Sequence, residues 1–169
     1  MKSDSILPIG LKLGSVAVLA KYEFYLERIQ ITLSHLDIEV DYFKNFGDLL
    51  NSQNLRKYEV IFIPHYSSII PIDFVNNYIC VGFHTGNLPN DRGGSPIQNK
   101  ILKKEYDTYV NAFIMDKEID SGATLCKKSL DISVGDINQI YLNIANIVAD
   151  MILTICTRFP KPVAQAKSK

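Results

Sequence analysis

Apolar runs separated by polar turns divide the chain into short segments, and the spacing of the apolar residues changes between segments. Compact or alternating apolar runs predict strands at residues 13–20, 38–43, 58–63, 78–83, 108–115 and 125–130. Apolar positions three and four residues apart predict an amphipathic helix at 22–36, and a wider stripe predicts a last helix from Asp136 to Ile155. Shorter helices are expected at 47–55 and 98–105, whereas 73–77 is too short to assign.

The order of these segments predicts the fold class. Strand, helix, strand, helix, strand over residues 13–63 is typical of right-handed βαβ crossovers and a parallel sheet. We therefore expect an α/β protein with a Rossmann-like, mostly parallel twisted sheet and helices on both faces. No G-x-G-x-x-G follows the first strand, so the dinucleotide-binding fingerprint is missing. We expect a single domain over 1–169, with a mobile leader at 1–10 and a frayed, mobile tail from Phe159, including 160–169.

Composition limits the classes of partner. Hydrophobic residues make up 47% of the 169 residues, charged residues 21%, and the formal net charge is zero. A neutral chain gives no sign of nucleic-acid binding. The apolar run near the N-terminus is broken by Pro8 and Lys12, which argues against an export signal, and no run approaches the roughly 20 residues of a membrane span. We expect a cytoplasmic protein that binds neither nucleic acid nor membrane.

The three cysteines support the same compartment. Cys80, Cys126 and Cys156 are odd in number and far apart, without C-x-x-C spacing. This pattern argues against a disulfide framework and a zinc site, and it indicates packing residues in a reducing environment.

Polar loops follow two of the predicted strands. The strand at 78–83 leads to His84 and a loop rich in glycine and proline, and the strand at 108–115 leads to a loop with Asp120. Ligands of α/β sheets bind outside the carboxyl ends of strands, and we expect both strands to end at one edge of the sheet. A carboxylate that fixes a histidine tautomer is a common proton-handling pair. On pattern alone, both residues also fit ordinary loop positions.

The spacing around these two residues carries a resemblance to a known family. After His84 come Leu88-Pro89, Gly93-Gly94 and Pro96-Ile97, and the second loop reads Met115-Asp116 followed by Asp120-Ser121-Gly122. This arrangement resembles the 10-formyltetrahydrofolate-dependent formyltransferases, and it looks most similar to small sugar N-formyltransferases of the pseudaminic acid type. The resemblance extends over about 13–153.

The resemblance implies a reaction and a set of site residues. An acceptor amine would attack the formyl carbon, with His84 assisting and Asp120 orienting the histidine. The formyl donor would be 10-formyltetrahydrofolate, with no metal required. Its expected contacts are His65, Tyr66, Ser67, Ile69, Asp116 and Ile119. The expected substrate contacts are Asn87, Pro89, Arg92, Gly93 and Gly94. As lone loop residues, His65 and Arg92 also fit structural roles.

One position departs from the family pattern. The family has Asn two residues before the histidine, where this chain has Gly82. Since that Asn helps to hold the formyl oxygen, Thr85 or Asn87 is a candidate replacement donor. Three interpretations stay open: a substitute donor, a shifted geometry, or a degenerate fold that binds folate or nucleotide sugar without turnover.

The expected acceptor is a nucleotide-linked amino sugar. Methionyl-tRNA formyltransferases carry a further C-terminal RNA-binding domain, whereas this chain ends after its last predicted helix. The loop is most similar to enzymes that act on a UDP-4-amino-4,6-dideoxy sugar in pseudaminic acid biosynthesis. A flavodoxin-like or receiver-like regulatory domain is the alternative from another class, but Ala20 and Lys21 stand where its acidic pocket would be. The broad stripe of the last helix fits either burial on its own sheet or a homodimer contact.

Overall fold

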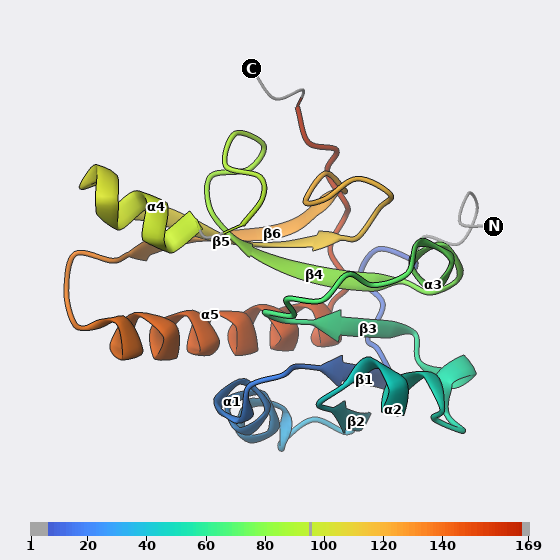
Figure 1. The fold of residues 1–169 in the computed structure, drawn as a ribbon. Helices are drawn as coiled ribbons and strands as arrows, with labels where there is room; N and C mark the ends of the chain where they lie inside the picture. Colours follow the sequence, from blue (N-terminus) through green and yellow to red (C-terminus); the bar gives the residue numbers. More distant parts are fainter. Residues whose placement is uncertain (1–6, 95, 167–169) are drawn as a thin grey trace.

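The computed structural model describes residues 7–94 and 96–166, and its centre is a six-stranded sheet in the order β2-β1-β3-β4-β5-β6 (Figure 1). The strands are β1 (Ser15–Leu19), β2 (Glu39–Phe43), β3 (Val60–Ile63), β4 (Cys80–Thr85), β5 (Asp107–Ile114) and β6 (Thr124–Asp131). The helices are α1 (Glu23–Leu33), α2 (Phe46–Leu50), α3 (Ile72–Asn77), α4 (Pro96–Lys103) and α5 (Ile137–Thr157), with a 3₁₀ turn at Leu55–Lys57. The expected α/β fold is confirmed.

Strand direction divides the sheet into two parts. β1, β2, β3 and β4 are parallel, whereas β5 runs antiparallel to both β4 and β6. His84 therefore pairs with Asn111, and Val81 pairs with Ile114 at the end of β5. The expectation that β4 and β5 end at the same edge is wrong. The chain after β5 must return along the sheet for Asp120 to approach His84.

Hydrophobic clusters lie on both faces of the sheet, as expected. α1 and α5 pack together on one face, where Ile29 and Ile152 are fully buried. The other face is covered by α2 and by α3, which the sequence left unassigned, through Leu49 and Phe74. The sheet thus lies between two packed layers, which fix the positions of the strands and of the loops that follow them.

Helix α5 begins and packs as its apolar pattern predicts. The Asp136 carboxylate accepts a hydrogen bond from the Gln139 N–H at 2.9 Å, which satisfies one free donor at the helix start. By length and a mean hydropathy of 1.6, α5 would also suffice for a membrane span, so the expectation that no run reaches that length is wrong. Half of this apolar stretch of α5 is buried inside the fold, including Met151 and Ile152, which is the pattern of a core helix.

The segment after α5, for which the sequence predicted a frayed tail, makes contacts with the rest of the chain within residues 159–166. Phe159 is fully buried, and its N–H donates to the Leu11 carbonyl at 2.8 Å. Further along, Val163 and Thr124 exchange backbone hydrogen bonds of 2.8 and 2.9 Å. Residues 1–6 of the leader and 167–169 of the tail lie outside the described residues.

Candidate active site

His84 stands near the carboxyl end of β4 with only 6% of its surface exposed. Its Nδ1 lies 3.2 Å from Oδ2 of Asp120, and its Nε2 contacts the backbone carbonyl of Asp91. Each ring nitrogen therefore faces an oxygen atom that can accept a hydrogen bond. The structure thus brings together the two residues that the sequence predicted as the catalytic pair.

Asp120 reaches His84 because residues 115–123 fold back after β5. Its backbone has a left-handed φ of +54°, which is uncommon for a residue with a side chain. Its Oδ2 also accepts the Gly93 N–H at 3.0 Å. Two residues later, a Cβ at Gly122 would lie 1.7 Å from the Ile114 carbonyl oxygen, so only glycine fits there. The glycine of the Asp-x-Gly motif is therefore a steric requirement of the return loop.

Asn111 supports His84 from the neighbouring strand. Its side-chain amide is buried and donates to the backbone carbonyls of His84 at 3.2 Å and Gly86 at 2.6 Å. These bonds fix the point where β4 passes into the glycine-rich loop. The sequence analysis missed this residue, although one amide inside the apolar run 108–115 was a usable signal.

The loop that covers His84 is braced by Asp91. Burial acts to raise the pKa of the Asp91 carboxyl group, but the Asn87 N–H and the Lys100 ammonium group hold that pKa below its ordinary value. The Lys100 ammonium group also pairs with Glu105 at 3.1 Å. A charged Asp91 side chain therefore ties the loop to α4 while its carbonyl contacts His84.

A cavity of about 550 Å³ opens beside the His84–Asp120 pair. It is lined by seven further residues that the sequence predicted as contacts: His65, Tyr66, Ser67, Thr85, Gly93, Gly94 and Ile119. Ile63, Ile70 and Phe113 add apolar side chains to its lining. The cavity can therefore hold a flat, partly apolar ligand with one end next to the histidine.

Five other predicted contacts do not line this cavity: Ile69, Asn87, Pro89, Arg92 and Asp116. Ile69 is 91% exposed, and the Asn87 side-chain oxygen accepts a hydrogen bond from Lys127 at 2.8 Å instead. Arg92 belongs to a smaller cleft of about 90 Å³ with Lys100. Of the two candidate oxyanion donors, only Thr85 lies at the cavity.

Gly82 lines the same cavity, but the space for a side chain there is taken. A Cβ at this position would lie 2.9 Å from Cζ of Phe113 and 3.2 Å from Cγ of Met115. The Phe113 ring thus stands where an asparagine side chain would begin. Adding that asparagine would require Phe113 to move, because real Cβ contacts are longer than this.

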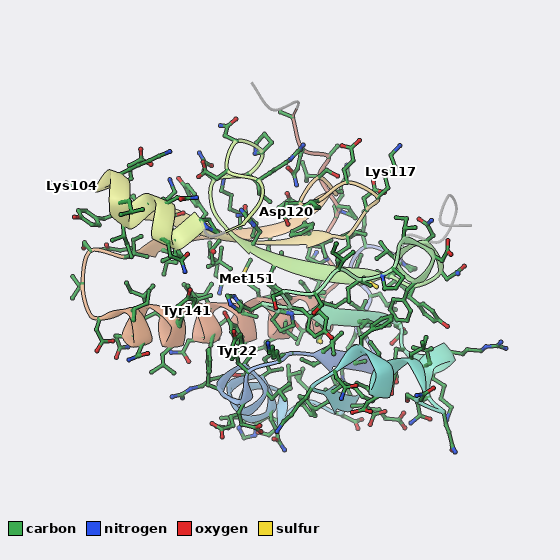
Figure 2. All side chains as sticks on the ribbon, viewed as in Figure 1. Tyr22, Lys104, Lys117, Asp120, Tyr141 and Met151 are labelled. Atoms are coloured by element: carbon green, nitrogen blue, oxygen red, sulfur yellow. The ribbon has the colours of Figure 1, made fainter. Side chains whose placement is uncertain are left out.

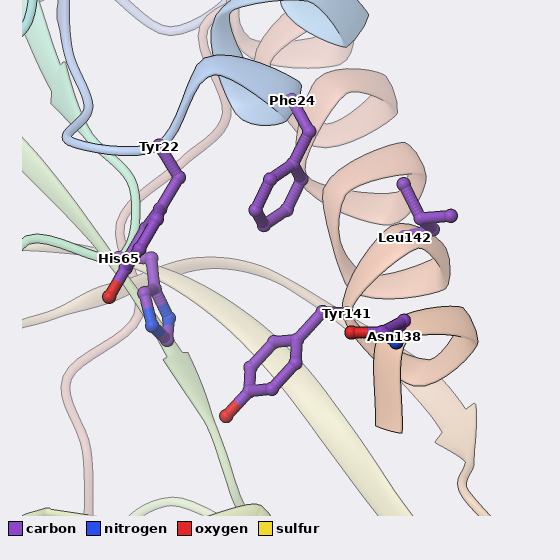
Figure 3. A pocket seen from close by; sticks show the side chains of 6 residues that line it. All are labelled: Tyr22, Phe24, His65, Asn138, Tyr141 and Leu142. Atoms are coloured by element: carbon purple, nitrogen blue, oxygen red, sulfur yellow. The ribbon is translucent and has the colours of Figure 1, made fainter. Parts of the chain in front are cut away.

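An aromatic pocket of about 370 Å³ adjoins the cavity and is lined by Tyr22, Phe24, His65, Asn138, Tyr141 and Leu142 (Figure 3). His65 and Tyr141 line both spaces, and Figure 2 labels Tyr141 on α5 and Asp120 on the β5–β6 loop. Tyr22 and Tyr141 lie in the two segments that the sequence analysis predicted only as helices, 22–36 and 136–155. They line these spaces because of the way in which α1 and α5 pack together, which the sequence pattern does not specify.

His65 forms the wall between the two spaces. Its backbone has a left-handed φ of +48°, and its ring stacks on Tyr25 at 5.7 Å and lies 5.4 Å from the Tyr22 ring. Burial lowers the pKa of the His65 imidazole below its ordinary value, so the ring stays neutral near pH 7. The neutral ring and the neighbouring aromatic side chains offer faces on which a flat ligand group can stack.

The comparisons with known proteins identify the family of the chain. The formyl transferase family matches residues 44–150, and the chain belongs to this family. The match includes His84 and Asp120, whereas Tyr22, Phe24 and the segment after α5 lie outside it.

Its curated relatives include methionyl-tRNA formyltransferases. That of Campylobacter lari is 26% identical over 80% of this chain and 46% of its own length, and that of Campylobacter jejuni is 33% identical over 61% and 34%. The chain thus spans less than half the length of these relatives.

Solved structures show the same fold. The methionyl-tRNA formyltransferase of Clostridium thermocellum has a TM-score of 0.84 at 29% identity and covers 93% of this chain and 71% of its own. A formyltransferase of Anoxybacillus kamchatkensis, solved with UDP-4,6-dideoxy-4-formamido-L-AltNAc and tetrahydrofolate, has a TM-score of 0.71 at 18% identity, covering 92% and 83%.

Proposed function

We propose that this chain transfers a formyl group from 10-formyltetrahydrofolate to the primary amine of an acceptor. The observation that carries this proposal is the His84–Asp120 pair beside a cavity of about 550 Å³, in a chain of the formyl transferase family. In the balanced reaction, the amine nitrogen forms a bond to the formyl carbon, and the bond from that carbon to the folate nitrogen breaks. The proton that the amine loses ends on the folate nitrogen.

The two residues have separate tasks in this reaction. Asp120 faces Nδ1 of His84, which orients the ring and leaves Nε2 as the nitrogen that meets the substrate. A hydrogen on Nε2 stabilises negative charge on the formyl oxygen, and the pair relays the amine proton. The Asp91 carbonyl now contacts Nε2, so the substrate must take over that contact.

The two adjoining spaces divide the substrates between them. The larger cavity fits the folate, because its apolar side chains can hold a flat ring while Ser67 and the loop carrying Asp120 offer polar groups. When bound, 10-formyltetrahydrofolate supplies the activated formyl carbon. The aromatic pocket, reached past His65 and Tyr141, is then the place for part of the acceptor.

Two acceptor classes have support. A nucleotide-linked amino sugar, such as a UDP-4-amino-4,6-dideoxy sugar of pseudaminic acid biosynthesis, is supported by the motif spacing and by the likeness to the Anoxybacillus structure. Methionyl-tRNA is supported by the names of the curated relatives and by the higher TM-score of the Clostridium structure. Both acceptors join a primary amine to a nucleotide, so the same site chemistry serves either one.

Detection of formylated product tests the proposal. The protein is incubated with 10-formyltetrahydrofolate and either the UDP-4-amino sugar or methionyl-tRNA, and the product is identified by mass spectrometry against enzyme-free controls. Formylation of one acceptor supports the proposal and identifies the acceptor class. Binding of folate without product from either acceptor would favour the degenerate fold, for which Gly82 is the motivating residue.

We also propose that the protein works in the cytoplasm. The three cysteines are not joined in disulfides. Burial raises the pKa of the Cys126 thiol to about 11 and that of the Cys156 thiol to about 12, so both stay protonated and unreactive near neutral pH. These are packing residues that suit a reducing compartment.

A further inference from the structure

The segment after α5 lies beside the loop that carries Asp120. Val163 pairs with Thr124 through two backbone hydrogen bonds, which extends the sheet at the start of β6. This pairing brings Gln165 next to the return loop at residues 115–123.

One side chain there contacts both loops of the site. The Gln165 amide nitrogen donates to the backbone carbonyls of Asp120 and Gly122, each at 2.8 Å. Its amide oxygen accepts from the Arg92 guanidinium group at 3.1 Å. Since the amide has both a donor and an acceptor end, glutamine satisfies all three contacts.

These contacts form a closed ring around the catalytic aspartate. Arg92 is followed by Gly93, whose N–H donates to the Asp120 carboxylate, and the Asp120 carbonyl returns to Gln165. Asp120 has a left-handed backbone, which persists in a residue with a side chain only where the surrounding structure holds it. Gln165 binds the carbonyl of that strained residue.

We propose that Gln165 is a positioning residue that holds Asp120 against His84. It touches neither His84 nor the cavity, so it acts through the Asp120 backbone. The kinetic part of this inference rests on the proposed function, whereas the placement of Asp120 is measurable without catalysis.

Two substitutions separate the parts of the contact. Gln165→Glu keeps the size and the acceptor for Arg92, but it removes both donors and sets a carboxylate oxygen against two carbonyls. Arg92→Met removes only the tie to the glycine-rich loop. Val163→Ala is the matched control, because Val163 is 62% exposed and pairs through its backbone alone.

We expect Gln165→Glu to lower the single-turnover rate about 10- to 100-fold, because small misplacements of a catalytic group have effects of that size. The KM for the folate should change by less than about twofold, and Val163→Ala should leave both constants unchanged. In an Asp120→Asn background, Gln165→Glu should add little further loss, since both changes act on the same group. Full rates in Gln165→Glu, or additive losses in the double variant, would overturn the proposal.

The imidazole NMR signals of His84 give a readout that does not depend on activity. The chain has 3 histidines, so the His84 signals are assigned by comparison with His84→Ala. Gln165→Glu should displace them in the same direction as Asp120→Asn, whereas Val163→Ala should not. Unchanged signals in Gln165→Glu would contradict the positioning role, even in an active enzyme. A displacement in a protein without turnover would retain that role and refute only the proposed function.

Discussion

At the scale of single residues, the sequence predicted the central pair of the site but not the residue that supports it. The motif spacing predicted His84 and Asp120 as partners, and their atoms do meet at 3.2 Å. The same spacing gave no sign of Gln165, because its contacts join segments far apart in the sequence and depend on the path of the chain after α5. Two of its three partners are backbone carbonyls, which leave no complementary side chain for sequence analysis to find, and the third, Arg92, lies 73 residues away along the chain.

Gly122→Ala tests the steric reason for the Asp-x-Gly motif. A Cβ at this position would lie 1.7 Å from the Ile114 carbonyl oxygen, so the backbone must shift. We expect a loss of unfolding free energy of about 3 kcal/mol, measured by urea denaturation, together with a lower rate of formyl transfer. Gly94→Ala is the control, since no atom lies within 4 Å of its Cβ position and its stability should not change. Equal stability of both variants would show that the loop has room at Gly122.

His65 makes stability depend on pH in a definite direction. Burial lowers the pKa of His65 in the fold, so the unfolded chain binds a proton near its ordinary pKa of 6.5 while the folded chain does not. The unfolding free energy contributed by neutral His65 is therefore present above that pH and is lost as the pH falls. Between about pH 7.5 and about pH 5.5, His65→Asn should lose less unfolding free energy than the wild type. Asparagine tolerates the left-handed backbone, and equal losses in both proteins would contradict this assignment.

Helices and strands were predicted well where the apolar residues follow a clear helical or strand pattern. The strands and the two long helices follow from the sequence, and Asp136 marks the start of α5. Helix α3 was missed because Ile72–Asn77 has only 6 residues, too few for a helical period. The direction of β5 in the sheet could not be predicted either, because the alternation of apolar residues is the same for a parallel and an antiparallel strand. Consequently Asp120 was expected at a strand end, whereas a returning loop carries it.

Phe159 tests whether the segment after α5 is part of the fold. Its ring is fully buried and its backbone is bonded to both Gly10 and Leu11, so Phe159→Ala should lower the unfolding free energy by about 3–5 kcal/mol. Val163→Ala, at a 62% exposed side chain, should change it by less than about 0.5 kcal/mol. Chemical denaturation compares the two, and a small effect at Phe159 would return this segment to the frayed tail that composition suggested.

The whole molecule combines a family core with contacts from both ends of the chain. Residues 44–150 match the formyl transferase family and include His84 and Asp120, but Tyr22 and Phe24 of the aromatic pocket precede that match and Gln165 follows it. The core accounts for the predicted chemistry. The aromatic pocket and the contacts of Gln165 with Asp120 could be found only in the three-dimensional arrangement, because they bring together residues far apart in the sequence.

The rate of a single formyl transfer measures the central claim most directly. Enzyme in excess over 10-formyltetrahydrofolate is mixed with the acceptor that gives product, and wild type, Asp120→Asn and His84→Ala are compared. We predict that His84→Ala lowers the rate by about 10²–10⁴-fold and that Asp120→Asn also lowers it strongly, while folate affinity changes little. A wild-type rate in His84→Ala would contradict the assignment of formyl transfer to the His84–Asp120 pair.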